Sequence, residues 1–224
     1  MGFFGSFTKD IEVWVDRETE IMRFAEWFLY TLSERCIKYC GKAVTSVQFP
    51  VFKKFLLARI KRELQYYRLC LDTAAVINEA GGGVCDTDVE EILDASIDLD
   101  RRLKGDIKLL PIRIEFAYDK ILPLRRERTR KLVQLFATLL GSADAEDYNG
   151  MVRNAFDRDA FLELNNEILE LYTEEAFLVN SSIKSLINVD SEAIAHRMYC
   201  SMLDVGIGLN RELADDIFGG KKRG

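Results

Sequence analysis

Four residues of this chain have the types and the spacing of metal ligands. Cys36 and Cys40 lie four residues apart. His196 and Cys200 repeat that spacing near the other end of the chain. Residues four apart share one face of a helix, so two such pairs on neighbouring helices would offer three thiolates and an imidazole to a tetrahedral zinc ion. Free cysteine is also commonly buried, and we therefore expect core thiols, a hydrogen-bonded histidine and no cofactor, with zinc as the alternative.

A second group of candidate side chains is basic. It comprises Arg125, Arg126, Arg128, Arg130 and Lys131, with Arg59, Lys61 and Arg62 as a further basic group. Such a cluster could bind a phosphate, an anionic lipid headgroup or an acidic partner protein. No aromatic residues interleave with it as base-stacking platforms would, which disfavours nucleic acid. We expect a solvated surface here, with an anion or partner site as the alternative.

Acidic side chains gather between residues 86 and 100, where the sequence has no Lys or Arg. They are Asp86, Asp88, Glu90, Glu91, Asp94, Asp98 and Asp100. The stretch does not match the calcium-binding loop of an EF-hand, because its fifth position holds Glu and its sixth lacks Gly. We expect a solvated helix face, with acids favoured near the start of the helix by the helix dipole.

The pair Glu90-x3-Asp94, the length of the chain and a plan of six helices together resemble the PhoU-type phosphate-transport regulators. In that family, two three-helix halves carry acidic E/D-x3-D motifs that bind metal clusters. The counterparts in the second half of this chain would be Glu115-x3-Asp119 or Glu170-x3-Glu174. The resemblance implies a metal- or anion-responsive regulator, which we keep as an alternative function.

No nucleotide-binding loop or catalytic-triad signature is visible in the sequence. Glu163, Glu167, Glu170 and Glu174 are similar to the acids of di-iron bundles, but those sites need a Glu-x-x-His motif on two helices. The chain has one histidine, so that site cannot be built and acid–base catalysis by histidine would depend on His196 alone. We expect a protein that is not an enzyme, and an enzyme without a recognisable linear motif is the second alternative.

The apolar residues indicate which elements must position these side chains. In the first long segment they recur at steps of three and four residues, at Phe7, Ile11, Trp14, Ile21, Ala25, Phe28 and Leu32. Only a helix brings such positions onto one face. The same spacing returns in later segments and predicts an all-α bundle of about six long helices, arranged as one up-and-down bundle or as two three-helix units.

Glycines, prolines and capping residues predict the ends of these helices. We expect the first helix to end at Gly41 and the second to run from Pro50 to the glycines at 81–83. A short helix over 144–156 precedes the last two, which a break at 188–191 separates.

The segment over 107–118 fits a strand and a helix equally well. We choose a helix, because a lone strand would leave its backbone groups unpaired. Pro123 should kink or split this helix, since proline removes a backbone donor and crowds the preceding turn.

Glu18 and Arg128 stand where their apolar stripes call for an apolar residue. If their helices are neighbours, the two side chains could pair in the interface and determine its register. The alternative is that each helix bends outward at that point.

Length and composition restrict the class of protein. The chain has 224 residues, of which 48% are hydrophobic, and is expected to form a single elongated domain over 1–224. A sub-boundary is expected near 105–111, and a flexible basic tail over 219–224. The net charge of -6 disfavours a general nucleic-acid binder.

Three further features indicate a cytoplasmic protein. No uncharged apolar stretch approaches the eighteen residues of a membrane span. The start lacks the charged lead and apolar core of a secretion signal. The five cysteines are odd in number and form no C-x-x-C pair, which is typical of reduced thiols.

The first helix carries more apolar surface than one neighbour can cover, because a second stripe includes Val15, Met22, Leu29 and Cys36. Either this helix is central in the bundle, which we favour, or it forms an interface with a second copy or another protein. We therefore expect a non-enzymatic interaction, regulatory or structural assembly protein, with a protein partner or a homo-oligomer.

Overall fold

The computed structural model describes residues 3–40, 49–106, 110–142, 145, 147–184 and 191–219. Its elements are α1 (Phe3–Cys40), α2 (Phe49–Ala80), α3 (Asp86–Asp106), α4 (Leu110–Leu140), α5 (Tyr148–Ala155), α6 (Arg158–Lys184) and α7 (Ser191–Phe218). The described residues contain no strand, so the all-α prediction is confirmed. No helix in this part of the chain has the length and apolar character to cross a membrane.

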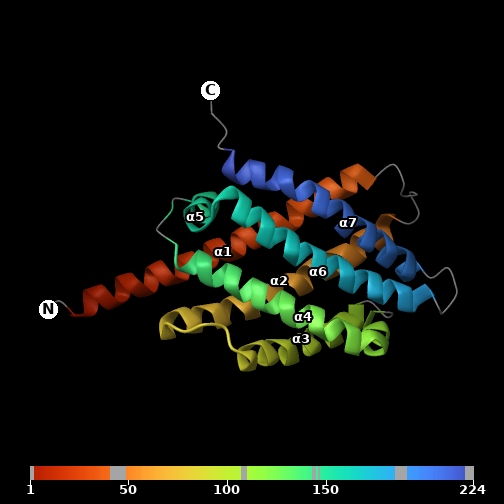
Figure 1. Ribbon diagram of the computed structural model, residues 1–224, viewed down its shortest axis with the longest axis horizontal. Coiled ribbons are helices and arrows are strands. Elements are labelled where there is room, and N and C mark those ends of the chain that lie inside the picture. Colours follow the sequence, from red (N-terminus) through yellow and green to blue (C-terminus); the bar gives the residue numbers. More distant parts are fainter. Residues whose placement is uncertain are drawn as a thin grey trace.

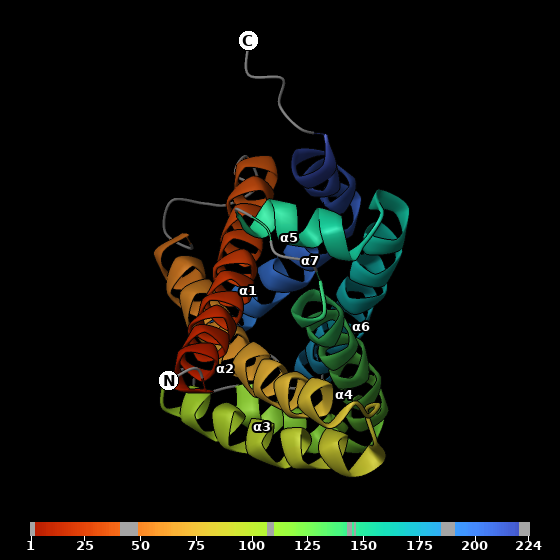
Figure 2. The same cartoon turned by 90° about the vertical axis from the view of Figure 1, so that its left-hand side faces the viewer.

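The helices pack around α2 and α4 (Figure 1). One side of α4 packs on α2 and α3, and another packs on α6. α7 lies across α6, α1 and α2, while α3 lies outside α2 and α4 (Figure 2). The short α5 contacts α1, α4 and α7 at one end of the bundle. Helices from both sides of residues 105–111 therefore pack against one another.

Local chemistry explains the helix ends. α2 stops at Gly81, whose φ of 64° is a conformation that glycine adopts at little cost. α5 starts after Asp147, whose Oδ1 accepts a hydrogen bond of 2.6 Å from the Gly150 amide. The predicted start near residue 144 is therefore wrong, because Asp147 is the capping residue. Asp157 caps α6, accepting from the Ala160 amide at 2.8 Å.

The helix predicted over 107–118 is confirmed for the described residues, as α4 begins at Leu110, while 107–109 lie outside them. Pro123 does not split α4, which continues on both sides of it. Pro123 and Asp119, the residue whose carbonyl loses its helical partner, are both exposed.

The apolar stripe of α1 is buried at Ile21, Ala25, Phe28 and Leu32. Leu32 packs on α7 at Gly206, where a Cβ atom would lie 3.4 Å from Leu32 Cδ1. A Cβ at this position would therefore already touch Leu32, and α7 continues through Gly206 unbroken. The first turns of α1 extend past the ends of the neighbouring helices, toward the N-terminus in Figure 1.

Candidate functional site: a buried chain of charges beside a cavity

Seven charged side chains from four helices are buried together in the core. In order of contact they are Arg59, Glu63, Arg62, Asp100, Arg125, Glu175 and Arg128. We call this set the charge chain, because positive and negative groups alternate along it. None of its members is more than 7% exposed.

The first half of the charge chain joins α2 to α3. Arg59 Nη2 lies 3.4 Å from Glu63 Oε1, one turn further along α2. Glu63 also accepts from Arg62 at 3.3 Å and from the Tyr172 hydroxyl at 2.6 Å. Arg62 Nε donates to Asp100 Oδ1 of α3 at 3.1 Å.

The second half joins α3 to α4 and α6. Arg125 Nη1 donates to Asp100 Oδ2 at 2.6 Å. The same guanidinium donates to Glu175 Oε1 through Nε at 2.9 Å and Nη2 at 2.7 Å. Arg128 donates to the other oxygen of Glu175 and stacks over the Tyr172 ring, with its Cζ 3.9 Å from the ring centroid. Such charge-assisted contacts offset the cost of removing these groups from water.

The pKa values of these groups are moved away from neutrality. Burial by itself would raise the pKa of Asp100, but Arg62 and Arg125 outweigh it and hold that pKa below its usual range. Arg125 and Arg128 do the same for Glu175. The carboxylates therefore stay ionised at neutral pH, and the arginines stay charged.

The charge chain is not neutral. Its four arginines exceed its three carboxylates by one, which leaves one buried positive charge. Both ends of the chain are arginines, and the Nε atoms of Arg59 and Arg128 make no hydrogen bond within the described residues. Arg128 has a short contact to a carboxylate oxygen and a ring at 3.9 Å, whereas Arg59 has a carboxylate contact of 3.4 Å and the Tyr199 ring at 5.1 Å. The surplus charge is therefore least compensated at Arg59.

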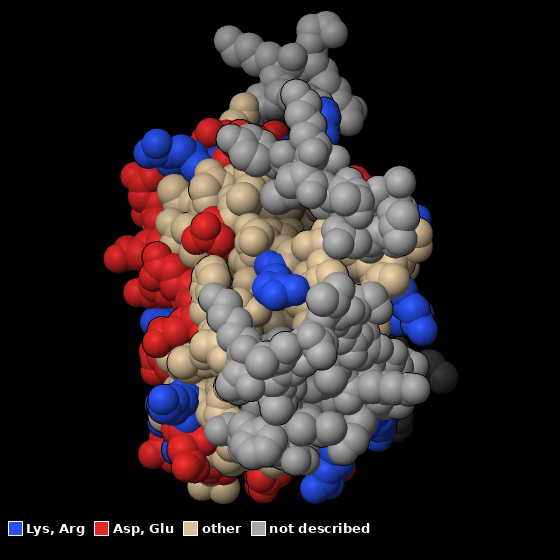
Figure 3. All heavy atoms as spheres, turned by 90° about the vertical axis from the view of Figure 1, so that its right-hand side faces the viewer, with Lys and Arg blue, Asp and Glu red and all other residues tan. Residues whose placement is uncertain are grey.

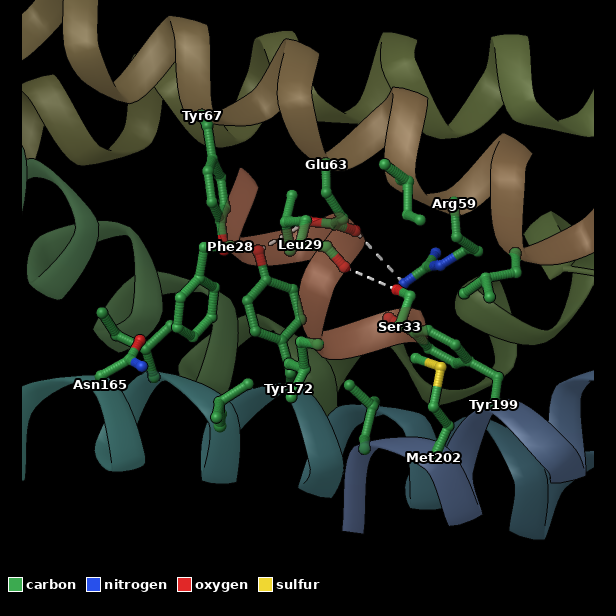
Figure 4. Close-up of a pocket in the computed structure, with 16 residues that line it drawn as sticks. Phe28, Leu29, Ser33, Arg59, Glu63, Tyr67, Asn165, Tyr172, Tyr199 and Met202 are labelled. Atoms are coloured by element: carbon green, nitrogen blue, oxygen red, sulfur yellow. Dashed lines mark hydrogen bonds and ion pairs between the residues drawn. The ribbon is translucent and has the colours of Figure 1, made fainter. Parts of the chain in front are cut away.

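A cavity of about 40 Å³ adjoins Arg59, between α1, α2, α6 and α7. Figure 4 shows the Arg59 guanidinium, Glu63 and Ser33 on one side of it and the rings of Phe28, Tyr172 and Tyr199 around it. Tyr67 and the polar Asn165 also line it, and its other walls are apolar: Leu29, Leu32, Leu56, Ile60, Ile168, Leu169, Met202 and Leu203. The Ser33 hydroxyl donates to the Leu29 carbonyl at 2.7 Å. The site thus combines one poorly compensated cation with a mostly apolar space.

The three candidate metal ligands whose side chains are described hydrogen-bond to backbone carbonyls. His196 Nε2 lies 3.1 Å from the Ala176 oxygen, which also accepts from Cys200 Sγ at 3.3 Å. Cys36 Sγ donates to the Met202 oxygen at 3.4 Å, and the side chain of Cys40 lies outside the described residues. No group of three or more His, Cys, Asp or Glu suited to a metal occurs in the described part of the chain. Burial lowers the pKa of His196 to about 4, so the imidazole is neutral at pH 7.

The basic cluster does not form one surface patch. Arg125 and Arg128, like Arg59 and Arg62 of the further basic group, are buried in the charge chain, so the expectation of a solvated surface is wrong for all four. The other three members of the cluster pair with acids of neighbouring helices: Arg126 with Glu90 at 2.5 Å, Arg130 with Asp86 at 2.6 Å, and Lys131 with Glu167 at 2.8 Å. The cause is the position of α4, which presents one face to the core and another to the rim of α3 and α6.

Two other expectations about charged residues also change. Asp100 lies in the core and not on a solvated face. Glu18 pairs with Arg68 of α2 at 2.5 Å, so the predicted pair between Glu18 and Arg128 is wrong. Arg128 of α4 pairs instead with Glu175 of α6.

The residues that sequence reasoning missed are Glu63 and Glu175. A signal for both exists in the sequence, since each occupies a position of an apolar stripe where an apolar residue is due. Glu63 falls between Ile60 and Tyr67, and Glu175 falls between residues 171 and 178. A charged residue in such a position indicates a buried partner, but not which one.

Comparison with known proteins adds no assignment. No family model, curated protein or solved structure matches the chain.

Proposed function

We propose that this protein is a non-enzymatic interaction module, in which the bundle is a rigid scaffold and the start of α1 binds a partner protein. The main support is the extension of α1 past its neighbours (Figure 1). A helix that extends past its neighbours is placed to contact another protein.

The sequence of this part of α1 fits a known mode of recognition. Phe7, Ile11 and Trp14 stand at positions i, i+4 and i+7, which share one helical face. This is the spacing with which an amphipathic helix occupies an apolar groove, and aromatic residues commonly supply most of the binding energy in such interfaces. The expected partner is therefore a protein with an apolar groove as wide as one helix.

The core supports a scaffold more than a catalyst. The ionisable groups of the charge chain titrate far from neutrality, and burial keeps His196 neutral. General acid–base catalysis works best with a pKa near the working pH. The alternating charges instead join α2, α3, α4 and α6 through defined contacts, which suits a scaffold of constant shape.

The test is a triple variant, Phe7→Ser, Ile11→Ser and Trp14→Ser, in the full chain. Its control carries Glu26→Ser, Glu34→Ser and Lys38→Ser, three exposed positions later in α1. Proteins captured by the wild-type chain are identified, purified and titrated against all three forms by calorimetry, and light scattering measures the mass of each form. We expect the triple variant to lose binding to the purified partner, and the control to retain it.

A second copy of the chain would be identified as the partner if the wild type is a dimer and the triple variant a monomer. If the wild type is monomeric and the triple variant binds every purified partner as tightly as the wild type does, the proposal is wrong.

A further inference from the structure

We propose that the cavity beside Arg59 binds a small, planar oxoanion with a single negative charge, such as a short carboxylate, and that Arg59 holds it. This inference is independent of the interaction surface on α1. It assigns a ligand to a region of the core that the scaffold role does not use.

The charge of the ligand follows from the charge chain. One positive charge more than the number of carboxylates is buried, and an uncompensated buried charge is costly. Among the residues that line the cavity, the charged ones are Arg59 and Glu63. Glu63 already accepts from Arg62 and Tyr172, whereas Arg59 keeps an Nε atom without a hydrogen bond to the described residues. A single negative charge placed at Arg59 would bring the buried total to zero.

The size of the ligand follows from the cavity. A volume of about 40 Å³ holds roughly three or four non-hydrogen atoms, since about 10 to 15 Å³ of such volume is needed for one water molecule. Nucleotides, sugar phosphates and other polyanions are far too large. The outer surface disfavours polyanions as well, because acidic side chains gather along one edge of the face in Figure 3 and the net charge is -6.

The shape of the ligand follows from the chemistry of the walls. Arg59 is 7% exposed and reaches the cavity from α2, with its guanidinium held 5.1 Å over the Tyr199 ring. A planar guanidinium matches the two oxygens of a planar oxoanion better than it matches a sphere. Leu32 and Met202, two apolar side chains that also line the cavity, would accept a methyl group. Acetate has the required charge, size and planar shape and also carries a methyl group, whereas nitrate and bicarbonate have the required charge, size and planar shape without one.

The experiment compares acetate with acetamide, which has nearly the same size and shape but no charge. The full-length protein is titrated with each by calorimetry and by NMR, in HEPES buffer at constant ionic strength. Sodium gluconate supplies the remaining salt, because its anion is too large for the cavity. Nitrate is titrated as a planar anion without a carbon skeleton, and chloride as a spherical anion.

We expect one acetate per chain with a Kd below about 10 mM, and at least about tenfold weaker binding of acetamide and chloride. If nitrate binds as well as acetate does, the site accepts planar oxoanions in general, and if acetate binds without nitrate, the site is specific for carboxylates. Binding of acetate or of nitrate supports the proposal. Equal binding of acetate and acetamide would show that charge plays no role. Binding of chloride as tight as acetate, or of neither oxoanion, would also overturn the proposal.

Variants then test the role of Arg59. Arg59→Met should weaken acetate binding by at least about tenfold, while Arg68→Met, an exposed position on the same helix, should leave it unchanged. Arg59→Lys keeps the charge without the planar fork and should bind acetate more weakly than the wild type does. If acetate binds equally to wild type and to a folded Arg59 variant of either kind, Arg59 does not hold the ligand.

Discussion

The charge chain makes a quantitative prediction about Glu175. This side chain is 5% exposed, accepts two hydrogen bonds from Arg125 and one from Arg128, and is the one carboxylate that joins α4 to α6 within the charge chain. Glu175→Gln keeps the shape but removes the charge, so four arginines would face two carboxylates. The buried surplus rises from one positive charge to two.

Breaking a buried ion pair by removing one partner costs about 3–5 kcal/mol. The amide oxygen of glutamine still accepts one hydrogen bond, so we expect the free energy of unfolding to fall by about 3 kcal/mol. Urea unfolding followed by circular dichroism measures this loss. Glu167→Gln is the control on the same helix: its carboxylate is 45% exposed and pairs with Lys131, and its loss should stay below about 1 kcal/mol.

A second substitution separates charge from packing. Arg128→Met in the Glu175→Gln protein leaves three arginines and two carboxylates, which restores a surplus of one. We expect this double variant to recover at least about 1 kcal/mol over Glu175→Gln alone, although Arg128→Met by itself destabilises. If the two losses simply add, or if Glu175→Gln costs no more than Glu167→Gln, the surplus of buried positive charge is not what destabilises the Glu175→Gln protein.

Two other predictions concern the interface of α7 and its histidine. Burial lowers the pKa of His196 from 6.5 to about 4. Between these pH values the unfolded chain therefore binds more protons than the folded chain does. The free energy of unfolding should fall by about 3 kcal/mol as the pH decreases from 6.5 to 4. His196→Phe should remove this part of the pH dependence in urea titrations, and an unchanged slope would contradict it. Gly206→Val should lower the free energy of unfolding by about 1–3 kcal/mol, because a Cβ would already lie 3.4 Å from Leu32 and valine adds two methyl groups. A Cβ at Gly208 meets nothing within 4 Å, so Gly208→Ala should raise the free energy of unfolding by up to about 1 kcal/mol. Thermal unfolding of the two glycine variants measures both effects, and equal shifts of the two would contradict the close approach of α1 and α7.

The helices and most of their ends follow from the sequence, because the signals are local. The three- and four-residue spacing of Ile21, Ala25, Phe28 and Leu32 forms a stripe on any helix, whatever packs against it. Gly81 ends α2 because glycine adopts a positive φ easily, and Asp157 starts α6 by capping a free amide nearby. These effects act over a few residues, so no knowledge of the tertiary structure is needed to predict them.

The partners of the charged residues were decided by the tertiary structure alone. Arg125 and Arg126 are adjacent in a basic run, yet one is buried against Glu175 and the other pairs with Glu90 at the rim. Sequence spacing alone cannot distinguish them, because burial depends on which helix lies across α4 and at what angle. The same holds for Arg59, whose surplus charge and neighbouring cavity exist only where four helices meet. A charged residue in an apolar stripe indicates a buried partner, but only the packing of the helices determines which residue is that partner and whether the buried charges balance.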